Sequence, residues 1–284
     1  MTHDLHYGIP GRPLIGSIRG VVPRRILKPI QRVRYPLPQV KKRPMTVCIA
    51  AICEERGTND KCILLCADTR LEYGVSSNDS NRKIGKLAHG WIGMLSGDFV
   101  AASELHDWIK AGILAGVPAD RTALHGVLVE ASRGFMGTPF HKKNAIEIMV
   151  CGFAGNVPTI ASVSVGRASS PTVEFYQTFH ASGSGAIIAE VFMNLRDLSP
   201  RFSIDHAAYI VYEAKRYSEK NPGVGPQTVL LAMRPRTVNA GADEFGIYAL
   251  DVGAMKEMEE ARVRYGVKEI EEIPDSVRFT ELSQ

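Results

Sequence analysis

Residues 46–68 read TVCIAAICEERGTNDKCILLCAD, and they set the pattern that the rest of the chain repeats. Residues 46–54 form a nearly continuous apolar run, which is typical of a strand that is covered on both faces. A polar turn follows at residues 55–61, and a second apolar strand returns over residues 62–68. Because strands joined by a tight turn are antiparallel, this stretch predicts a hairpin that is buried on both sides.

The remaining sequence alternates further strand pairs with pairs of helices. Strands are predicted at residues 83–87, 91–96, 145–153, 159–165, 173–179, 227–233 and 245–250. Helices are predicted at residues 98–115, 120–134, 186–195 and 204–217, and Asp98 and Asp120 are suitable N-caps for the first two. We therefore predict an α+β fold, in which two antiparallel sheets pack face to face and helix pairs cover their outer surfaces.

The composition is that of a globular protein. The 284 residues are 45% apolar and 23% charged, which excludes collagen, coiled coils and wholesale disorder. No apolar run approaches the roughly 18 residues of a membrane helix, so we predict a soluble protein without a membrane partner. The cysteines are odd in number and lie in mostly apolar surroundings, which favours reduced thiols in a cytoplasmic protein. They are Cys48, Cys53, Cys62, Cys66 and Cys151.

Residues 1–45 differ in character from the rest. They carry ten basic residues and one acidic residue, a balance of +9, and seven of the sixteen prolines. Such a segment neither forms a helix nor buries a core, so we predict a disordered, basic, proline-rich segment. Its role stays open between a transit peptide, a nucleic-acid-binding arm, a removable pro-segment, a tail without a role, and residues ahead of a true start at Met45. The prolines disfavour the first role, and charge without a folded platform binds phosphates weakly, so we expect no nucleic-acid partner.

Several common kinds of site have no matching pattern in the sequence. The eight histidines are scattered, and the pair Cys62 and Cys66 has no second ligand pair at a zinc spacing. The sequence has no phosphate-binding glycine-rich loop followed by Lys-Ser/Thr, and no G-x-S-x-G elbow. We therefore predict a protein without a metal or a cofactor.

Five short motifs follow one another in the chain: residues 45–51 (MTVCIAA), 66–70 (CADTR), 82–84 (RKI), 96–97 (SG) and 183–185 (GSG). Together they resemble the proteasome-type peptidases, which are N-terminal-nucleophile (Ntn) hydrolases, and they look most similar to the bacterial proteasome homologues known as Anbu. The resemblance covers about residues 46–250. It implies a four-layer αββα sandwich, a threonine-type endopeptidase or amide hydrolase, peptide or protein substrates, and assembly into homo-oligomeric rings or larger oligomers. It leaves open whether an ATPase unfoldase feeds the enzyme.

Carried over residue by residue, the resemblance implies five catalytic residues. Thr46 matches the N-terminal threonine whose hydroxyl attacks the scissile carbonyl. Asp68 matches the aspartate that holds the active-site lysine, and Lys83 matches that lysine. Gly97 matches the glycine whose backbone N–H stabilises the oxyanion, and Ser184 matches the serine that hydrogen-bonds near the threonine amine.

These residue types suit the chemistry. A hydroxyl is a poor nucleophile until a base takes its proton, and a free α-amine, with a reference pKa of about 7.7–8.0, supplies one near neutral pH. A neighbouring lysine cation favours the neutral amine and the developing alkoxide. The amine is free only where Thr46 is the first residue of the mature chain, because a peptide nitrogen is not a base.

Each residue also has a plainer alternative. Thr46 suits the start of a strand because it is β-branched. Asp68 suits a strand-end turn, and Lys83 suits a solvated surface charge paired with Asp79. The remaining two residues suit the entry of a helix. The competing hypothesis for the whole chain is a non-catalytic assembly subunit of the same fold with an unprocessed N-terminus, in which Thr46 is never uncovered.

The sequence departs from the family pattern at four places, one of which is the first hairpin, whose turn at residues 55–61 makes it longer than usual. Pro44 and Met45, rather than glycine, precede the threonine, which favours a true start at Met45 followed by methionine removal. Residues 217–225 (YSEKNPGVG) contain no aspartate at the position where the family often has one. A charged tail follows residue 250 as a solvated helix or an interaction arm. The predicted division is therefore residues 1–45, a proteasome-like domain over 46–250, and a C-terminal extension over 251–284.

Overall fold

A computed structural model describes residues 46–73, 76–79, 83–88, 90–142, 145–166, 170–235, 245–265 and 279–281. The predicted disordered segment of residues 1–45 and the possible roles given to it lie outside these residues, as does Arg82 of the RKI motif. The fold described below therefore begins at Thr46, two residues before Cys48, where the first strand begins.

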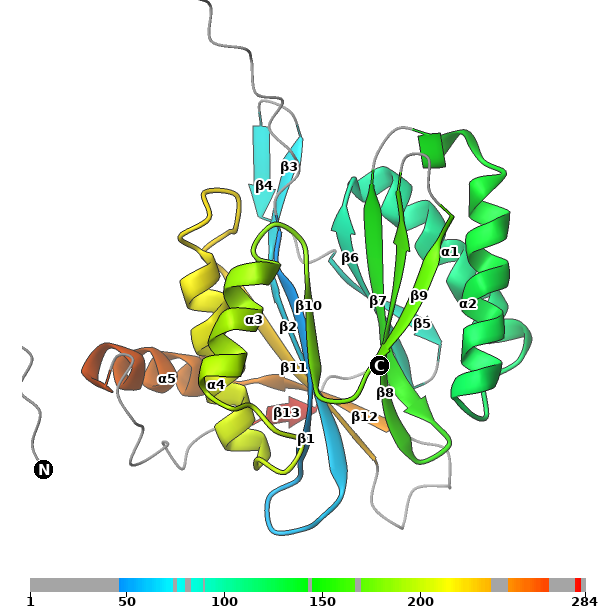
Figure 1. The fold of residues 1–284 in the computed structure, drawn as a ribbon. Helices are drawn as coiled ribbons and strands as arrows, with labels where there is room; N and C mark the ends of the chain where they lie inside the picture. Colours follow the sequence, from blue (N-terminus) through cyan, green and yellow to red (C-terminus); the bar gives the residue numbers. More distant parts are fainter. Residues whose placement is uncertain are drawn as a thin grey trace, which may run out of the picture. The chain divides into compact units, whose positions relative to one another are not determined.

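The larger of the two main sheets has the strand order β10-β1-β2-β11-β12-β13, and every neighbouring pair is antiparallel (Figure 1). Its strands are β1 (Cys48–Glu54), β2 (Lys61–Asp68), β10 (Phe179–Ser182), β11 (Thr228–Pro235), β12 (Phe245–Leu250) and β13 (Phe279–Glu281). We call it the first sheet. The hairpin predicted from residues 46–68 lies inside this sheet, since β1 pairs with both β2 and β10.

The second sheet has the order β5-β6-β7-β8-β9 and is also antiparallel throughout. Its strands are β5 (Ile84–Ala88), β6 (Trp91–Gly97), β7 (Ile146–Ala154), β8 (Val157–Val165) and β9 (Thr172–Tyr176). A separate two-stranded ladder is formed by β3 (Arg70–Tyr73) and β4 (Ser76–Asp79).

Four of the described helices occur in two pairs, as the sequence predicts, and a fifth follows β12. The helices are α1 (Phe99–Ala115), α2 (Arg121–Met136), α3 (Ala186–Leu195), α4 (Ile204–Ser218) and α5 (Val252–Tyr265), with a short 3₁₀ turn η1 at Pro139–Lys142. The side chains of Asp98 and Asp120 accept hydrogen bonds from the backbone N–H groups of Ala101 and Ala123. Both predicted N-caps are therefore confirmed, because each carboxylate satisfies an orphan donor of the first helical turn.

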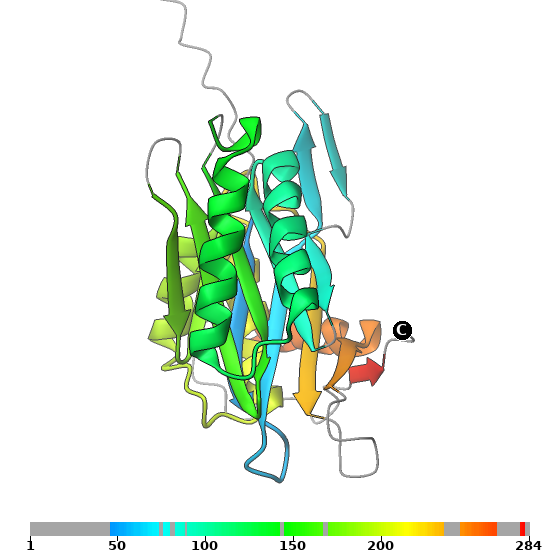
Figure 2. The same cartoon turned by 90° about the vertical axis from the view of Figure 1, so that its right-hand side faces the viewer.

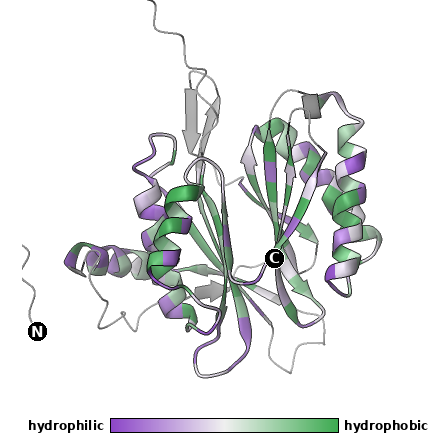
Figure 3. Cartoon of the chain, in the orientation of Figure 1, coloured by the Kyte–Doolittle hydropathy of each residue, from purple (hydrophilic) through white to green (hydrophobic). Residues whose placement is uncertain are grey.

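Three apolar layers hold the elements together. One lies between the first sheet and α3 and α4, one between the two sheets, and one between the second sheet and α1 and α2. Figure 2 shows α1 and α2 side by side across the outer face of the second sheet. Figure 3 shows apolar residues along the strands of both sheets. The predicted α+β class with two antiparallel sheets is confirmed, and the order of layers is compatible with the predicted αββα sandwich.

The alternation of side chains along β1 explains why its sequence is apolar on both faces. Ile49 and Ala51 contribute to the layer under α3 and α4, whereas Cys48, Ala50 and Ile52 contribute to the layer between the sheets. Successive side chains of a strand point to opposite faces, so a strand covered on both sides carries no polar face.

The structure differs from the prediction at residues 173–179, which were expected to form one strand. The chain there forms the end of β9 and the start of β10, separated by Gln177 and Thr178, and these strands belong to different sheets. The prediction was wrong because the run is rich in β-branched and aromatic residues from Val173 to Phe179, and such a run does not reveal where one strand ends or which partner strand each part finds.

Beyond residue 250 the chain adds two elements to the core. Helix α5 buries Ala254, Met258 and Ala261 in the layer that also contains α3 and α4, and β13 pairs with β12. The tail was expected to form a solvated helix or an interaction arm. The burial of one side of α5 was not part of that expectation. A row of alanine and methionine among charged residues gave only a weak signal for this packing.

All five cysteines are free and buried, in agreement with the predicted reduced thiols. Cys62 and Cys66 face the same apolar layer, under α4, as two residues at this spacing on one strand must. No helix within the described ranges is both long and apolar enough to cross a bilayer. Across the same residues, no three His, Cys, Asp or Glu side chains are placed to hold a metal ion.

Candidate active site

The five predicted site residues come from both sheets. Thr46 precedes β1, Asp68 ends β2 and Ser184 lies between β10 and α3, all on the first sheet. Lys83 directly precedes β5 and Gly97 ends β6, both on the second sheet. Because β1 and β2 are antiparallel, the start of one strand lies beside the end of the other, which brings Thr46 to Asp68.

The carboxylate of Asp68 is the centre of the site. Its Oδ1 accepts hydrogen bonds from Thr46 Oγ1 at 2.7 Å, from Val47 N at 2.9 Å and from Lys83 Nζ at 2.8 Å. Its Oδ2 accepts the backbone N–H of Gly225 at 2.9 Å. Asp68 is only 1% exposed, and a buried carboxylate is costly unless such donors surround it. Both carboxylate oxygens of Asp68 therefore accept hydrogen bonds, and one of them also pairs with a lysine, so Asp68 is more than a turn residue at the end of a strand.

Lys83 is buried and paired with Asp68, with only 4% of its side chain exposed. The alternative of a solvated surface charge is therefore wrong. Its ammonium and the Thr46 hydroxyl donate to the same oxygen, so the two groups are no further apart than two hydrogen bonds laid end to end. A cation thus lies beside the hydroxyl in a buried, low-dielectric place, where its field acts strongly.

The Gly-Ser-Gly turn holds the backbone of Thr46. Thr46 N–H donates to Ser184 Oγ at 3.1 Å, and Gly185 N–H donates to the carbonyl oxygen of Thr46 at 3.1 Å. Gly183 has φ +90°, and a Cβ there would lie 2.4 Å from the Thr46 carbonyl oxygen, so this position requires glycine. The N-cap of α3 is Gly185, without a side-chain cap bond, so Ser184 does not serve as the capping residue.

Gly97 also occupies a position that only glycine fits. Its φ is +91°, and a Cβ would lie 2.6 Å from the carbonyl oxygen of Ala145. The cap of α1 is Asp98, so Gly97 is not the capping residue. The thiol of Cys48 donates to the carbonyl oxygen of Leu95 at 3.5 Å, which joins the start of β1 to the end of β6 across the two sheets.

Two residues that sequence reasoning did not assign support the turn: Ser218, the last residue of α4, and Asn221, in the loop between α4 and β11. Asn221 Nδ2 donates to the carbonyl oxygen of Ser184 at 2.9 Å, and Ser218 Oγ donates to that of Gly185 at 3.1 Å. Both lie within residues 217–225, the stretch that lacks the aspartate the family often has. The available signal was the NPGVG sequence ahead of a strand, which indicates a tight loop with polar backbone groups to satisfy.

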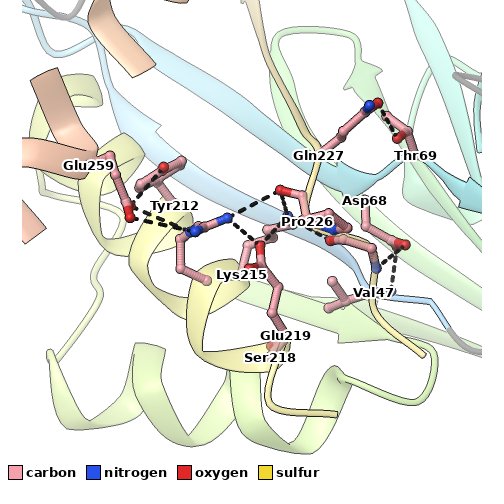
Figure 4. A network of polar contacts seen from close by, with 12 residues as sticks. Val47, Asp68, Thr69, Tyr212, Lys215, Ser218, Glu219, Pro226, Gln227 and Glu259 are labelled. Carbon is pink, nitrogen blue, oxygen red and sulfur yellow. Dashed lines mark hydrogen bonds and ion pairs between the residues drawn. The ribbon is translucent and has the colours of Figure 1, made fainter. Parts of the chain in front are cut away.

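A buried lysine fixes this loop from the far side (Figure 4). The Nζ of Lys215, on α4, donates to Glu219 Oε1 at 2.5 Å, to Gly225 O at 2.9 Å and to Pro226 O at 3.0 Å. Gly225 is therefore held at both ends, by Lys215 at its carbonyl and by Asp68 at its N–H. Burial lowers the pKa of Lys215, and the hydrogen bond and charge of Glu219 oppose that shift.

We expect Lys215→Met to destabilise the fold, although methionine is close to lysine in size. It leaves the carbonyl oxygen of Gly225 without its Lys215 donor, at a cost of about 1–3 kcal/mol for a buried group left unpaired. The carbonyl oxygen of Pro226 also loses Lys215 but keeps its hydrogen bond from Arg216. Chemical denaturation measures the change. Lys220→Met is the matched control, because Lys220 is exposed and lies only over the ring of Tyr217, so we expect a loss of at most about 1 kcal/mol. Equal midpoints for Lys215→Met and the unaltered chain would contradict this account of the loop.

Cys48 is the competing nucleophile nearest to Thr46 in the chain. Burial raises the pKa of the Cys48 thiol to about 12, although the charge of Lys83 acts in the opposite direction. The reactive form of cysteine is the thiolate, so this thiol is inert near neutral pH. Between the two side chains, the hydroxyl of Thr46 is the better placed nucleophile.

The geometry thus unites a hydroxyl, a cation, a carboxylate and a glycine-rich turn at one place where the two sheets meet. No protein-family model matches this chain, and no curated protein matches its sequence.

Proposed function

We propose that the protein is a threonine-type endopeptidase or amide hydrolase of the Ntn-hydrolase kind, with an αββα sandwich of the proteasome type. The mature chain would begin at Thr46. One observation carries the proposal: the Thr46 hydroxyl and the Lys83 ammonium both donate to the buried Oδ1 of Asp68. A surface threonine at a strand start has no need of a buried ion pair, whereas a nucleophile does.

In the proposed reaction, Thr46 Oγ1 bonds to the carbonyl carbon of the substrate amide while its proton passes to the free α-amine of the same residue. The C–N bond then breaks, and the proton moves from the α-amine to the leaving nitrogen. An ester to Thr46 remains. Water, deprotonated by the same α-amine, attacks the ester carbonyl. The C–O bond to Thr46 Oγ1 breaks, the acid leaves, and the proton passes from the α-amine to Thr46 Oγ1.

The remaining residues act on charge and orientation. Lys83 stabilises the developing alkoxide, and Asp68 holds Lys83 in place. Ser184 orients the nitrogen of Thr46, to which it is already hydrogen-bonded. The N–H of Gly97 is the proposed oxyanion donor, and a preorganised donor of this kind typically contributes about 2.7–4 kcal/mol.

We further propose that the substrates are peptides or proteins and that the protein assembles with copies of itself. An exposed apolar row on α3 supports assembly, with Ile187, Val191 and Leu195 at 77%, 51% and 68% exposure. Residues four apart lie on one face of a helix, so these side chains form a continuous apolar row.

The proposal is tested by preparing two forms of the protein. One begins at Met45 in a host whose methionine aminopeptidase exposes Thr46, and the other is the full chain from Met1. Intact mass and N-terminal sequencing establish the first residue. We expect the form that begins with Thr46 to hydrolyse fluorogenic peptide amides, and the full chain to be inactive while residues 1–45 remain attached, because a peptide nitrogen cannot act as the base.

The alternative is a non-catalytic assembly subunit whose threonine stays blocked. It is favoured by the same apolar row on α3, because assembly requires no chemistry. Oligomers formed by a Thr46-first chain that hydrolyses neither the peptide panel nor a panel of small acyl amides would support this alternative and exclude the enzyme.

A further inference from the structure

The proposed active site is divided between two sheets. Thr46, Asp68 and Ser184 belong to the first sheet, and Lys83 and Gly97 belong to the second. The sheets contact each other largely through apolar side chains, which resist separation but resist sliding only weakly. Catalysis requires reacting groups to be placed within a fraction of an ångström, so the relative position of the sheets needs directional contacts.

A charged cluster at the edge of the first sheet provides such contacts. His180, on β10, contacts Glu147 Oε1 through Nε2 at 2.7 Å and Glu190 Oε1 through Nδ1 at 3.1 Å. The ring of Tyr176, on β9, stacks on the imidazole with the centroids 3.8 Å apart. Glu147 belongs to β7 and Glu190 to α3, so only the first of the two ion pairs crosses between the sheets.

The crossing pair lies close to both halves of the site. On the first sheet, His180 is two residues before Ser182, which pairs with Cys48 at the start of β1. On the second sheet, Glu147 pairs directly with Ser96, the residue before Gly97. A shift at this contact therefore moves the end of β6 against the turn that holds Thr46.

The imidazole of His180 is a cation at neutral pH. Burial lowers the pKa of His180, but the hydrogen bonds and charges of Glu147 and Glu190 outweigh it and raise the pKa to about 9. The same contact lowers the pKa of Glu190. Tyr176 hydrogen-bonds to Glu174, and burial is the main reason that its pKa is raised to about 12, so it stays neutral beside the ring. As a cation, His180 donates from both ring nitrogens, whereas a neutral ring donates from one.

We propose that His180 is a positioning residue. It fixes the position of one sheet relative to the other at the active site by donating a hydrogen bond from the first sheet to Glu147 on the second. The inference rests on the proposed function for its effect on catalysis. Its effect on the packing of the sheets is independent of that function and can be measured separately.

The test compares three variants of the Thr46-first chain at pH 7. His180→Gln removes the cation, and Glu147→Gln removes the charge of the partner on the second sheet. Glu190→Gln is the matched control, since it removes a carboxylate of the same cluster that does not cross between sheets. We expect the first two variants to lower kcat about 10- to 100-fold with little change in KM, as a small misplacement of reacting groups does, and Glu190→Gln to lower it less than about 3-fold.

Cysteine alkylation followed by peptide mass mapping provides the second measurement, which needs no activity. Cys48 is buried between the sheets, whereas Cys66 is buried under α4 on the outer face of the first sheet. In His180→Gln and in Glu147→Gln we expect alkylation of Cys48 to rise about ten-fold or more relative to Cys66, the size expected when one charge-assisted hydrogen bond is lost. In the unaltered protein, the same ratio should rise with pH through about 9, as His180 loses its proton.

The outcomes separate the inference from the proposed function. If the unaltered protein is inactive but the ratio of Cys48 to Cys66 alkylation rises in both variants, the proposed function fails. The role of the His180–Glu147 contact in holding the two sheets together then stands. If the ratio is unchanged, or both thiols react faster together, His180 is not a positioning residue. Equal losses of kcat in Glu147→Gln and Glu190→Gln also overturn the inference. Glu147→Gln keeps the test usable if His180→Gln does not fold.

Discussion

We expect the replacement of Thr46 with alanine to abolish the proposed hydrolysis of peptide amides by the Thr46-first chain, while the fold and its midpoint of unfolding stay within a small margin of the unaltered protein. The hydroxyl donates one hydrogen bond to Asp68, which keeps its bonds from Val47 N–H, Lys83 and Gly225 N–H in the variant. The nucleophile is therefore removed without leaving the buried carboxylate unpaired. We expect the loss to reach the background rate, because the nucleophilic hydroxyl is gone and burial raises the pKa of the neighbouring Cys48 thiol to about 12, which keeps that thiol unreactive.

Thr46→Ser is the matched control for this prediction. Serine retains the hydroxyl and the α-amine and removes only a methyl group, so the variant should keep measurable activity. Initial rates on a fluorogenic peptide panel, with circular dichroism on the same samples, provide the measurement. Full activity in Thr46→Ala would show that the hydroxyl is not the nucleophile. The proposed mechanism would then fail, and the described fold would stand.

We expect the replacement of Lys83 with methionine to have the second large effect, on stability as well as on the proposed catalysis. The ammonium is the main cationic partner of Asp68 in a buried place, and removing one member of a buried ion pair costs about 3–5 kcal/mol because the other charge is left uncompensated. We expect kcat to fall by about 10²–10³, the effect of losing one preorganised electrostatic group at the reacting atoms. Denaturant unfolding and steady-state kinetics measure the two losses.

Two further variants distinguish a charge effect from a loss of packing. Lys86→Met removes an exposed lysine from β5, the strand that Lys83 directly precedes, and should leave both stability and kcat nearly unchanged. The double variant Asp68→Asn with Lys83→Met removes both buried charges, so it should recover part of the lost stability while activity stays absent. Recovery of activity in the double variant would show that the ion pair has only a structural role.

The local sequence was sufficient to predict the hairpins and most of the helices. Apolar runs separated by polar turns predicted β1, β2, β7 and β8 within one or two residues, and the N-caps Asp98 and Asp120 marked the starts of α1 and α2. These features depend on interactions between residues close together in the chain, so the local sequence contains all of the residues that determine them.

The candidate site could be assembled from the sequence only by resemblance to known motifs. Nothing in the residues around Lys83 indicates that its ammonium is buried, and the plainer expectation of a surface charge was wrong. The split of residues 173–179 into strands of two sheets, and the support of Gly225 by Lys215, were likewise missed.

The contacts that hold the site together join residues far apart in the chain. Glu147 and His180 are 33 positions apart, and Asp68 and Gly225 are 157 positions apart. Local sequence therefore specified the strands, helices and caps of this protein, because those depend on neighbouring residues. The packing of one sheet on the other chose the partners of its buried charges, because a buried ion is stable only where folding brings a counter-ion and hydrogen-bond donors or acceptors to it.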